Sequence, residues 1–179
     1  MAQYAEKIIE QSNVLLETAA KTRRISDILG DAPSIGNRNL ADLLPRVIND
    51  VSREYSDADI SLECPDSATV HCSRFLDEAF HEVLTNAIVH NDRDPVIHVT
   101  VMVDETTTTI EVTDNGPGIP KMEGDVLRGA SDVKPLAHGK GLGLWIVYWI
   151  VRRSGGTINI SEGIRRGSTV TFEFPHRET

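Results

Sequence analysis

The sequence is poor in the features that mark secreted, metal-stapled or membrane-embedded proteins. It has two cysteines in 179 residues, Cys64 and Cys72, and no CxxC pair of the kind that structural zinc sites use. Aromatic residues make up 5% of the chain, and no apolar run is long enough to span a bilayer. A leader of basic and then apolar residues is also missing. We therefore expect two free thiols, a cytoplasmic location and no inserted membrane segment, which is compatible with a membrane-anchored full-length parent.

Positive charge is also scarce. There are 27 Asp and Glu against 18 Lys and Arg, which gives a net charge of −9. Non-specific nucleic-acid binding needs a basic surface, so the charge balance argues against a nucleic-acid partner. Acidic residues, few lysines and threonine-rich segments such as VDETTTTIEV are together typical of salt-adapted proteins, and we hypothesise that the protein is halophilic. An ordinary acidic protein is the competing interpretation.

Hydrophobic periodicity and composition divide the chain into three parts. Residues 1–30 repeat apolar residues at helical spacing and predict one long helix that ends at Gly30. Residues 31–39 have the composition of a linker, and residues 40–179 are expected to form a domain. The apolar stripe of the long helix requires burial, either against the domain or against a second copy in a homodimer.

The order of elements after residue 39 predicts the fold class. We expect a helix over 40–55, two short strands over 59–73, a helix over 74–90, a hairpin over 95–116, a long irregular segment to residue 139, a helix over 141–154 and a final hairpin. Strands that come in hairpins, rather than alternating with helices, predict an α/β (α+β) two-layer sandwich. Its mixed, mainly antiparallel sheet would be covered by helices on one face.

Four short motifs contain candidate functional residues. The first could bind a metal ion, and the second could bind a nucleotide base. HEVLTNAIVHN spaces Glu82, Asn86 and His90 by four residues, which places them on one helix face. The amide oxygen of Asn86 is a suitable ligand for Mg²⁺. DNGPGIP follows a strand, so that the Asp114 carboxylate can accept a hydrogen bond from an exocyclic amine such as that of adenine. Taken singly, the first motif is more typical of a solvated helix face and the second of a turn.

The other two motifs could contact phosphate and the base. HGKGLGLWIV places Gly139, Gly141 and Gly143 before and within the start of a helix, where unpaired amides and the helix dipole attract phosphate, and Lys140 adds a cation. It is not a Walker A motif, because no Ser or Thr follows the lysine. GSTVTFEFP offers the hydroxyl of Thr169 from a strand. Each of these two motifs is weak evidence alone.

The four motifs together resemble a known superfamily. In order they read E-x-x-x-N-A on a helix, D-x-G-x-G after a strand, G-x-G-L-G-L before a helix and G-[ST]-T on the last strand, with a lid-length gap between the second and third. This arrangement resembles the GHKL superfamily of ATP-binding domains, which joins gyrase, heat-shock chaperone, histidine kinase and MutL domains. The resemblance covers about residues 40–175. GLGLWIVYWIVRRSGGTINI followed by GSTVTFEFP is most similar to the catalytic domain of sensor histidine kinases, and the leading helix is similar to the second helix of their dimerisation hairpin.

This resemblance implies a function. The chain would be the ATP-binding catalytic fragment of a two-component sensor histidine kinase, with ATP or ADP and Mg²⁺ as cofactors. It would transfer the γ-phosphoryl group to a histidine, and its partners would be a phosphoacceptor His segment and a response regulator. No histidine precedes His71, so the acceptor segment is not in this chain and autophosphorylation of the chain alone is not expected.

The resemblance also implies residue roles. Asp114 would hydrogen-bond the adenine amine, Gly118 and Thr169 would complete the adenine pocket, and Asn86 would coordinate Mg²⁺. Glu82, the second candidate catalytic residue beside Asn86, lies where gyrase-like ATPases keep the base that activates water. The remaining implied nucleotide contacts are His90, Asn91, Gly116, Ile119, Gly139, Lys140, Gly141, Leu142, Gly143 and Leu144. Residues 115–138 would form the ATP lid, which lacks the Phe of many kinases.

Three other functions stay open from the sequence. An anti-sigma-type serine kinase would share the fold, although such kinases usually lack a long leading helix. A gyrase-like ATPase would direct water with Glu82, although it needs a transducer domain. A nucleotide-binding or dimerisation module without kinase activity would bind nucleotide and transfer nothing.

Overall fold

The computed structural model describes residues 34–119, 142–162 and 166–176, together with six isolated positions among the first 33. The helix predicted over residues 1–30 lies outside the described residues apart from those positions, as does most of the predicted lid. The described elements are β1 (Ile35–Asn39), α2 (Leu40–Glu54), β2 (Asp59–Glu63), β3 (Thr69–Ser73), α3 (Leu76–Val89), β4 (Val96–Val103), β5 (Thr107–Asp114), α5 (Leu142–Arg153), β6 (Thr157–Glu162) and β7 (Ser168–Pro175).

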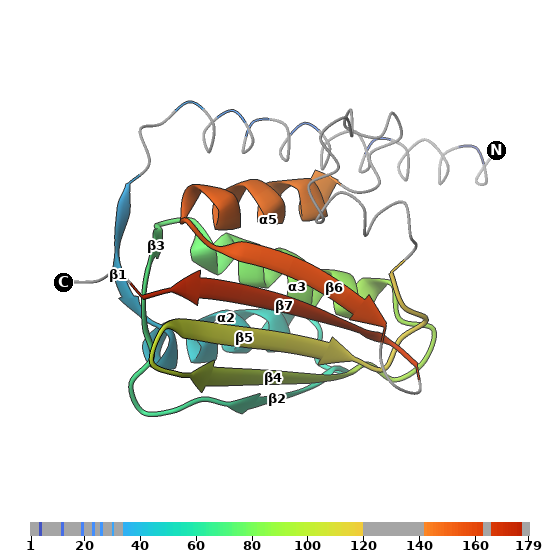
Figure 1. The fold of residues 1–179 in the computed structure, drawn as a ribbon. Coiled ribbons are helices and arrows are strands. Elements are labelled where there is room, and N and C mark those ends of the chain that lie inside the picture. The colour runs from blue at the N-terminus through green and yellow to red at the C-terminus, as the bar shows by residue number, and fades with distance from the viewer. Residues whose placement is uncertain are drawn as a thin grey trace.

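A five-stranded sheet forms one layer of the fold. Its strand order is β2-β4-β5-β7-β6, with β2 parallel to β4 and the other pairs antiparallel. Helices α2, α3 and α5 lie together on one face of this sheet (Figure 1). This confirms the predicted sandwich with a mixed, mainly antiparallel sheet and helices on one face.

Strict alternation of side chains builds the core between the two layers. On β7, Val170, Phe172 and Phe174 are buried, whereas Thr171 and Glu173 between them lie on the other face. The ring of Phe80 on α3 packs edge-on against Phe172, with 5.0 Å between the ring centroids. This contact joins α3 to the middle of β7, and the hydrogen bond between Asn91 and Asn115 joins the segments that follow α3 and β5.

The predicted linker over residues 31–39 contains a strand that the sequence did not indicate. Strand β1 pairs antiparallel with β3 in a separate two-stranded sheet, with Ile35 opposite Ser73 and Asn39 opposite Thr69. The segment IGNRN has low strand propensity, so its conformation depends on pairing with β3 rather than on local preference. The two short strands predicted over 59–73 are β2 and β3, and they belong to different sheets.

Both cysteines are free, as predicted. Cys72 is fully buried on β3, and burial raises the pKa of its thiol to about 11, an effect that Arg38 opposes and Asp77 reinforces. Burial also raises the pKa of Cys64, which is half-buried. Among the helices of the described residues, none combines the length and the apolar character needed to cross a membrane.

Candidate nucleotide-binding site

Helices α3 and α5 meet closely at the first motif. A Cβ atom added to Gly143, at the start of α5, would overlap Oε2 of Glu82 and would lie 3.5 Å from Nδ2 of Asn86. Glu82 and Asn86 therefore extend from the same face of α3 toward the beginning of α5, as their spacing predicted. A side chain at position 143 would compete with the Glu82 carboxylate for space. Two oxygen-bearing side chains are thus held against the start of a helix.

The carboxylate of Asp114 is fixed where β5 ends. Its Oδ1 accepts a hydrogen bond from the backbone N–H of Gly116 at 2.7 Å. Its Oδ2 accepts one from the hydroxyl of Ser168 at 2.6 Å and a longer one from the Ser168 backbone N–H at 3.3 Å. Oδ1 keeps acceptor capacity, since an ionised carboxylate offers about four acceptor sites and the three bonds use one on Oδ1 and two on Oδ2. The side chain is therefore oriented and able to accept a further hydrogen bond.

The structure does not bring Thr169 to this carboxylate. Thr169 lies on the other face of β7, where its hydroxyl shares a 2.9 Å hydrogen bond with the hydroxyl of Thr113. The preceding residue, Ser168, is only 2% exposed and makes the contact with Asp114. Sequence reasoning missed Ser168, although the alternation along β7 contained the signal. Ser168 has the same parity as Val170 and Phe172, whose side chains face the core.

Two glycine turns lie against one another beside Asp114. Gly167 has φ +87°, and a Cβ atom there would overlap the carbonyl oxygen of Asp114. Gly118 has φ +91°, and a Cβ atom there would lie 3.5 Å from the carbonyl oxygen of Gly167. Because both positions have positive φ, side chains would be strained at either one. The turn after β5 and the turn before β7 are therefore packed backbone to backbone.

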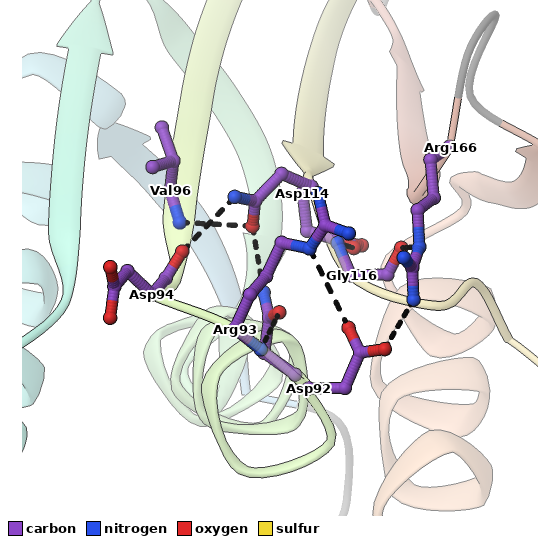
Figure 2. A network of polar contacts seen from close by, with 9 residues as sticks. Asp92, Arg93, Asp94, Val96, Asp114, Gly116 and Arg166 are labelled. Atoms are coloured by element: carbon purple, nitrogen blue, oxygen red, sulfur yellow. Dashed lines mark hydrogen bonds and ion pairs between the residues drawn. The ribbon is translucent and has the colours of Figure 1, made fainter.

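Residues that follow α3 complete this corner. The amide of Asn91 donates to Oδ1 of Asn115 at 2.7 Å, and its Nδ2 would lie 3.4 Å from a Cβ atom on Gly116. Oδ1 of Asn115 also accepts from the backbone N–H of Val96 at 3.1 Å, and the network is drawn in Figure 2. His90 is exposed at the end of α3. Asn91 is thus joined to the turn after β5, and Asn115 is a member of the network that the sequence did not single out.

The other predicted residues differ in their environment. Leu142 and Leu144 are 8% and 5% exposed, so their side chains belong to the interior. Ile119 is partly buried and packs against the core. Gly139, Lys140 and Gly141 lie outside the described residues. Within the described ranges, no three His, Cys, Asp or Glu side chains form a group that could hold a metal ion by themselves.

The arrangement defines a class of protein. An α/β sandwich brings together an aspartate fixed at a glycine turn, a hydroxyl from the last strand and a polar helix face beside the start of a second helix. These are the parts of a GHKL-type nucleotide-binding domain. The profile of the family described as "Histidine kinase-, DNA gyrase B-, and HSP90-like ATPase" matches residues 72–178, which is more than half of the chain, and the protein belongs to this family.

Similar proteins narrow the class further. The chain is 27% identical over 140 residues to the sensor-type histidine kinase PrrB of Mycobacterium tuberculosis, which covers 76% of this chain and 31% of PrrB. It is 26% identical over 177 residues to the sensor histidine kinase YxdK of Bacillus subtilis, which covers 94% of this chain and 54% of YxdK. The chain thus spans between about a third and about half of the length of these relatives.

Solved structures share the fold. The ATP-binding domain of PrrB from Mycobacterium tuberculosis superposes with a TM-score of 0.66 at 23% identity, over 80% of this chain and 98% of that domain. The histidine kinase AdeS of Acinetobacter baumannii gives a TM-score of 0.73 at 19% identity, over 97% of this chain and 84% of that one. With the family match and the sequence relatives, the chain is a catalytic ATP-binding domain of the sensor histidine kinase type.

Proposed function

We propose that this domain binds Mg-ATP and transfers the γ-phosphoryl group to a histidine on a phosphoacceptor segment outside this chain, from which a response regulator then receives it. The observation that supports this most is the Asp114 carboxylate, held by Gly116 and Ser168 with acceptor capacity remaining. The histidine kinase relatives favour transfer to a histidine over the serine-kinase, ATPase and binding-module alternatives. We place the domain in the cytoplasm, where ATP is available, and we propose that residues 1–30 form the helix of a homodimer.

Asp114 would select adenine. The exocyclic amine of adenine donates a hydrogen bond that an oriented carboxylate accepts, whereas guanine has a carbonyl oxygen at the same ring position. Two facing acceptors repel, and a buried acceptor without a donor loses affinity. Ser168 would keep the carboxylate in the selecting orientation. Gly118 would leave room for the base, because the backbone can approach where there is no side chain.

Asn86 and Glu82 would act at the phosphate end. The amide oxygen of Asn86 suits Mg²⁺, and because the described residues contain no complete ligand group, the remaining ligands would be phosphate oxygens and water. The metal ion would supply charge neutralisation for the phosphates. Glu82 would orient the attacking imidazole or accept its proton while a nitrogen–phosphorus bond forms and the bond to the bridging oxygen of ADP breaks. Positioning and charge neutralisation carry most of such a transfer.

Calorimetric titration tests the adenine site first. ADP and ATP would be titrated with and without Mg²⁺, in high KCl, into the wild type, Asp114→Asn and the control Asp57→Asn, which changes an exposed carboxylate away from the site. Loss of a hydrogen bond to a charged group should weaken ADP binding by roughly 10- to 100-fold in Asp114→Asn. Unchanged affinity in that variant, or no binding by folded wild type, would contradict the proposal.

Glu82→Gln separates transfer to histidine from ATP hydrolysis. If the domain were a gyrase-like ATPase, the wild type would release phosphate steadily and Glu82→Gln would abolish that release. For the proposed kinase we expect negligible phosphate release from the wild type. Labelling of a supplied acceptor segment from a relative would then depend on Glu82. Steady phosphate release that Glu82→Gln removes would favour the ATPase alternative.

A further inference from the structure

Arg166 joins three segments that surround Asp114. Its Nε donates to the carbonyl oxygen of Gly116 at 3.2 Å, in the turn after β5. Its Nη2 donates to the carboxylate of Asp92, in the segment after α3. Arg166 itself lies immediately before Gly167 and β7. Figure 2 shows the guanidinium between Asp92 and Gly116. Neither Arg166 nor Asp92 belongs to the four sequence motifs.

Gly116 is held from both sides of its backbone. Its N–H donates to Oδ1 of Asp114, and its C=O accepts from Arg166. The N–H and the C=O belong to neighbouring peptide units that share the Cα of Gly116, so the two bonds together restrict both backbone rotations of this residue. Gly116 and Gly118 give this turn backbone freedom that Pro117, between them, limits only in part. Arg166 is therefore linked to the Asp114 carboxylate through one residue, Gly116.

Stability alone does not account for this arrangement. The Arg166 and Asp92 side chains are 40% and 52% exposed, and exposed ion pairs contribute little to folding. A guanidinium, however, carries separate donors in a rigid plane and can hold two acceptors at a set geometry. A turn that is ordered before the ligand arrives does not have to be ordered by binding. The contact thus has its largest consequence for a ligand that binds at Asp114.

We propose that Arg166 is a positioning residue that fixes the turn after β5 through the carbonyl of Gly116 and so sharpens the selection of adenine by Asp114. Asp92 holds the guanidinium in place for this task. The role in adenine selection rests on the proposed function, whereas the ordering of the turn does not.

Hydrogen exchange of the Gly116 amide tests the ordering without any nucleotide. Arg166→Met removes both donors, and the matched control Arg53→Met removes an exposed arginine that pairs with Asp50 on α2. Exchange at Gly116 should accelerate about 10-fold or more in Arg166→Met, while Ile110 in the centre of β5 keeps its wild-type rate. An unchanged rate at Gly116 would overturn the proposal, whatever the nucleotide does.

Titration of ADP and GDP tests the consequence for selection. In Arg166→Met we expect ADP binding to weaken about 5- to 10-fold and the preference for ADP over GDP to fall, with the unfolding temperature within about 3 °C of wild type. Asp92→Asn should have a smaller effect, because the bond to Gly116 remains. The double variant should bind no more weakly than Arg166→Met, since the two residues act as one unit.

Together, the exchange and titration experiments distinguish a failure of the role proposed for Arg166 from a failure of the proposed function. Faster Gly116 exchange with unchanged ADP affinity and selectivity would show that Arg166 orders the turn but does not position Asp114, which overturns the proposed role. A wild type that binds no nucleotide contradicts the proposed function, and the exchange result still decides whether Arg166 orders the turn. A large loss of thermal stability in Arg166→Met alone would show that the residue is a structural support.

Discussion

A single hydroxyl group, that of Ser168, helps to orient the Asp114 carboxylate. Ser168 and Thr169 are neighbours of similar chemistry, yet only Ser168 contacts Asp114, while Thr169 bonds to Thr113 across the sheet. We predict that Ser168→Ala weakens ADP binding by roughly 10-fold, because a hydrogen bond to a charged group is lost. Thr169→Ala should leave ADP affinity within about twofold of wild type, since no polar contact to Asp114 is removed.

Calorimetry on the two alanine variants checks this prediction. Urea unfolding of the same samples separates loss of affinity from loss of stability. Equal losses of affinity in both variants, or a loss confined to Thr169→Ala, would show that the hydroxyl bound to Asp114 is not the one that matters for the nucleotide.

At the residue scale, the sequence was better at identifying candidate functional residues than at identifying which residues contact them. The four-residue spacing of Glu82 and Asn86 was sufficient to place both on one face of α3, because helical geometry relates them locally. Ser168 could have been predicted from its parity with Phe172. The contacts of Arg166 and Asn115 could not have been predicted. Gly116 lies 50 residues from Arg166, Asn91 lies 24 residues from Asn115, and only the tertiary fold brings these pairs together. Isolated polar residues in turns carry no periodicity that would reveal such partners.

The contact between α3 and α5 leads to a prediction at the element scale. We predict that Gly143→Ala leaves stability nearly unchanged but removes the contribution of Mg²⁺ to ATP binding. The new methyl group would meet the flexible end of Glu82, which can move aside at little cost, and alanine favours a helix by up to about 1 kcal/mol over glycine. The displaced Glu82 would then disturb Asn86, one turn along the same helix face.

The measurement is the ratio of ATP affinities with and without Mg²⁺, together with the unfolding temperature. Gly36→Ala on β1 is the matched control, because a Cβ atom there meets nothing within 4 Å. A Gly143→Ala variant with the wild-type Mg²⁺ effect would show that the close approach of the two helices does not shape the phosphate end.

A buried serine joins α5 to the small sheet. The hydroxyl of Ser154 donates to the carbonyl oxygen of Ile150 and accepts from the backbone N–H of Ser73 on β3, both at 2.8 Å. We predict that Ser154→Ala lowers the free energy of unfolding by about 1–3 kcal/mol, because the buried N–H of Ser73 is left without an acceptor. Urea unfolding measures this loss, and Ser161→Ala, on the exposed part of β6, should change it by less than about 0.5 kcal/mol. Similar losses of unfolding free energy in Ser154→Ala and Ser161→Ala would show that the hydrogen bond between Ser154 and Ser73 does not have this stabilising role.

The sequence predicted the elements that show a clear hydrophobic periodicity. It did not predict the strand that forms only by pairing with another strand. The β4–β5 and β6–β7 hairpins follow from apolar alternation on both sides of a turn, and α5 follows from a dense apolar run after glycines. In the first hairpin, Oδ1 of Asp104 accepts the N–H groups of Thr106 and Thr107, which lowers the pKa of that carboxyl. Strand β1 has no such signal, because IGNRN becomes a strand only through its register with β3.

At the scale of the whole molecule, topology rather than any single element makes the site. Strands β5 and β7 are neighbours in the sheet, although Asp114 at the end of β5 and Ser168 at the start of β7 are 54 residues apart in the chain. This neighbourhood places Asp114 against Ser168, and the packing of α3 beside α5 places Glu82 and Asn86 against Gly143. The order of the four motifs implied that they meet, but the sheet order that makes them meet was not in the pattern. The family resemblance, rather than propensity, supplied that step.

The net charge of −9 leads to a prediction for the whole chain. If mutual repulsion of acidic groups limits stability, KCl should stabilise the protein by screening, since the Debye length falls from about 10 Å at 0.1 M to about 3 Å at 1 M salt. At pH 7.5 we expect the unfolding temperature to rise between these concentrations by roughly 2–4 °C for each kcal/mol of repulsion removed. The matched condition is pH 5.1, the isoelectric point, where the net charge vanishes and the salt effect should shrink. Thermal unfolding followed by circular dichroism at the two pH values measures the salt effect.

An equal rise in unfolding temperature at pH 7.5 and pH 5.1 would show that salt stabilises the protein through something other than its net charge. No rise at pH 7.5 would contradict the hypothesis of salt adaptation.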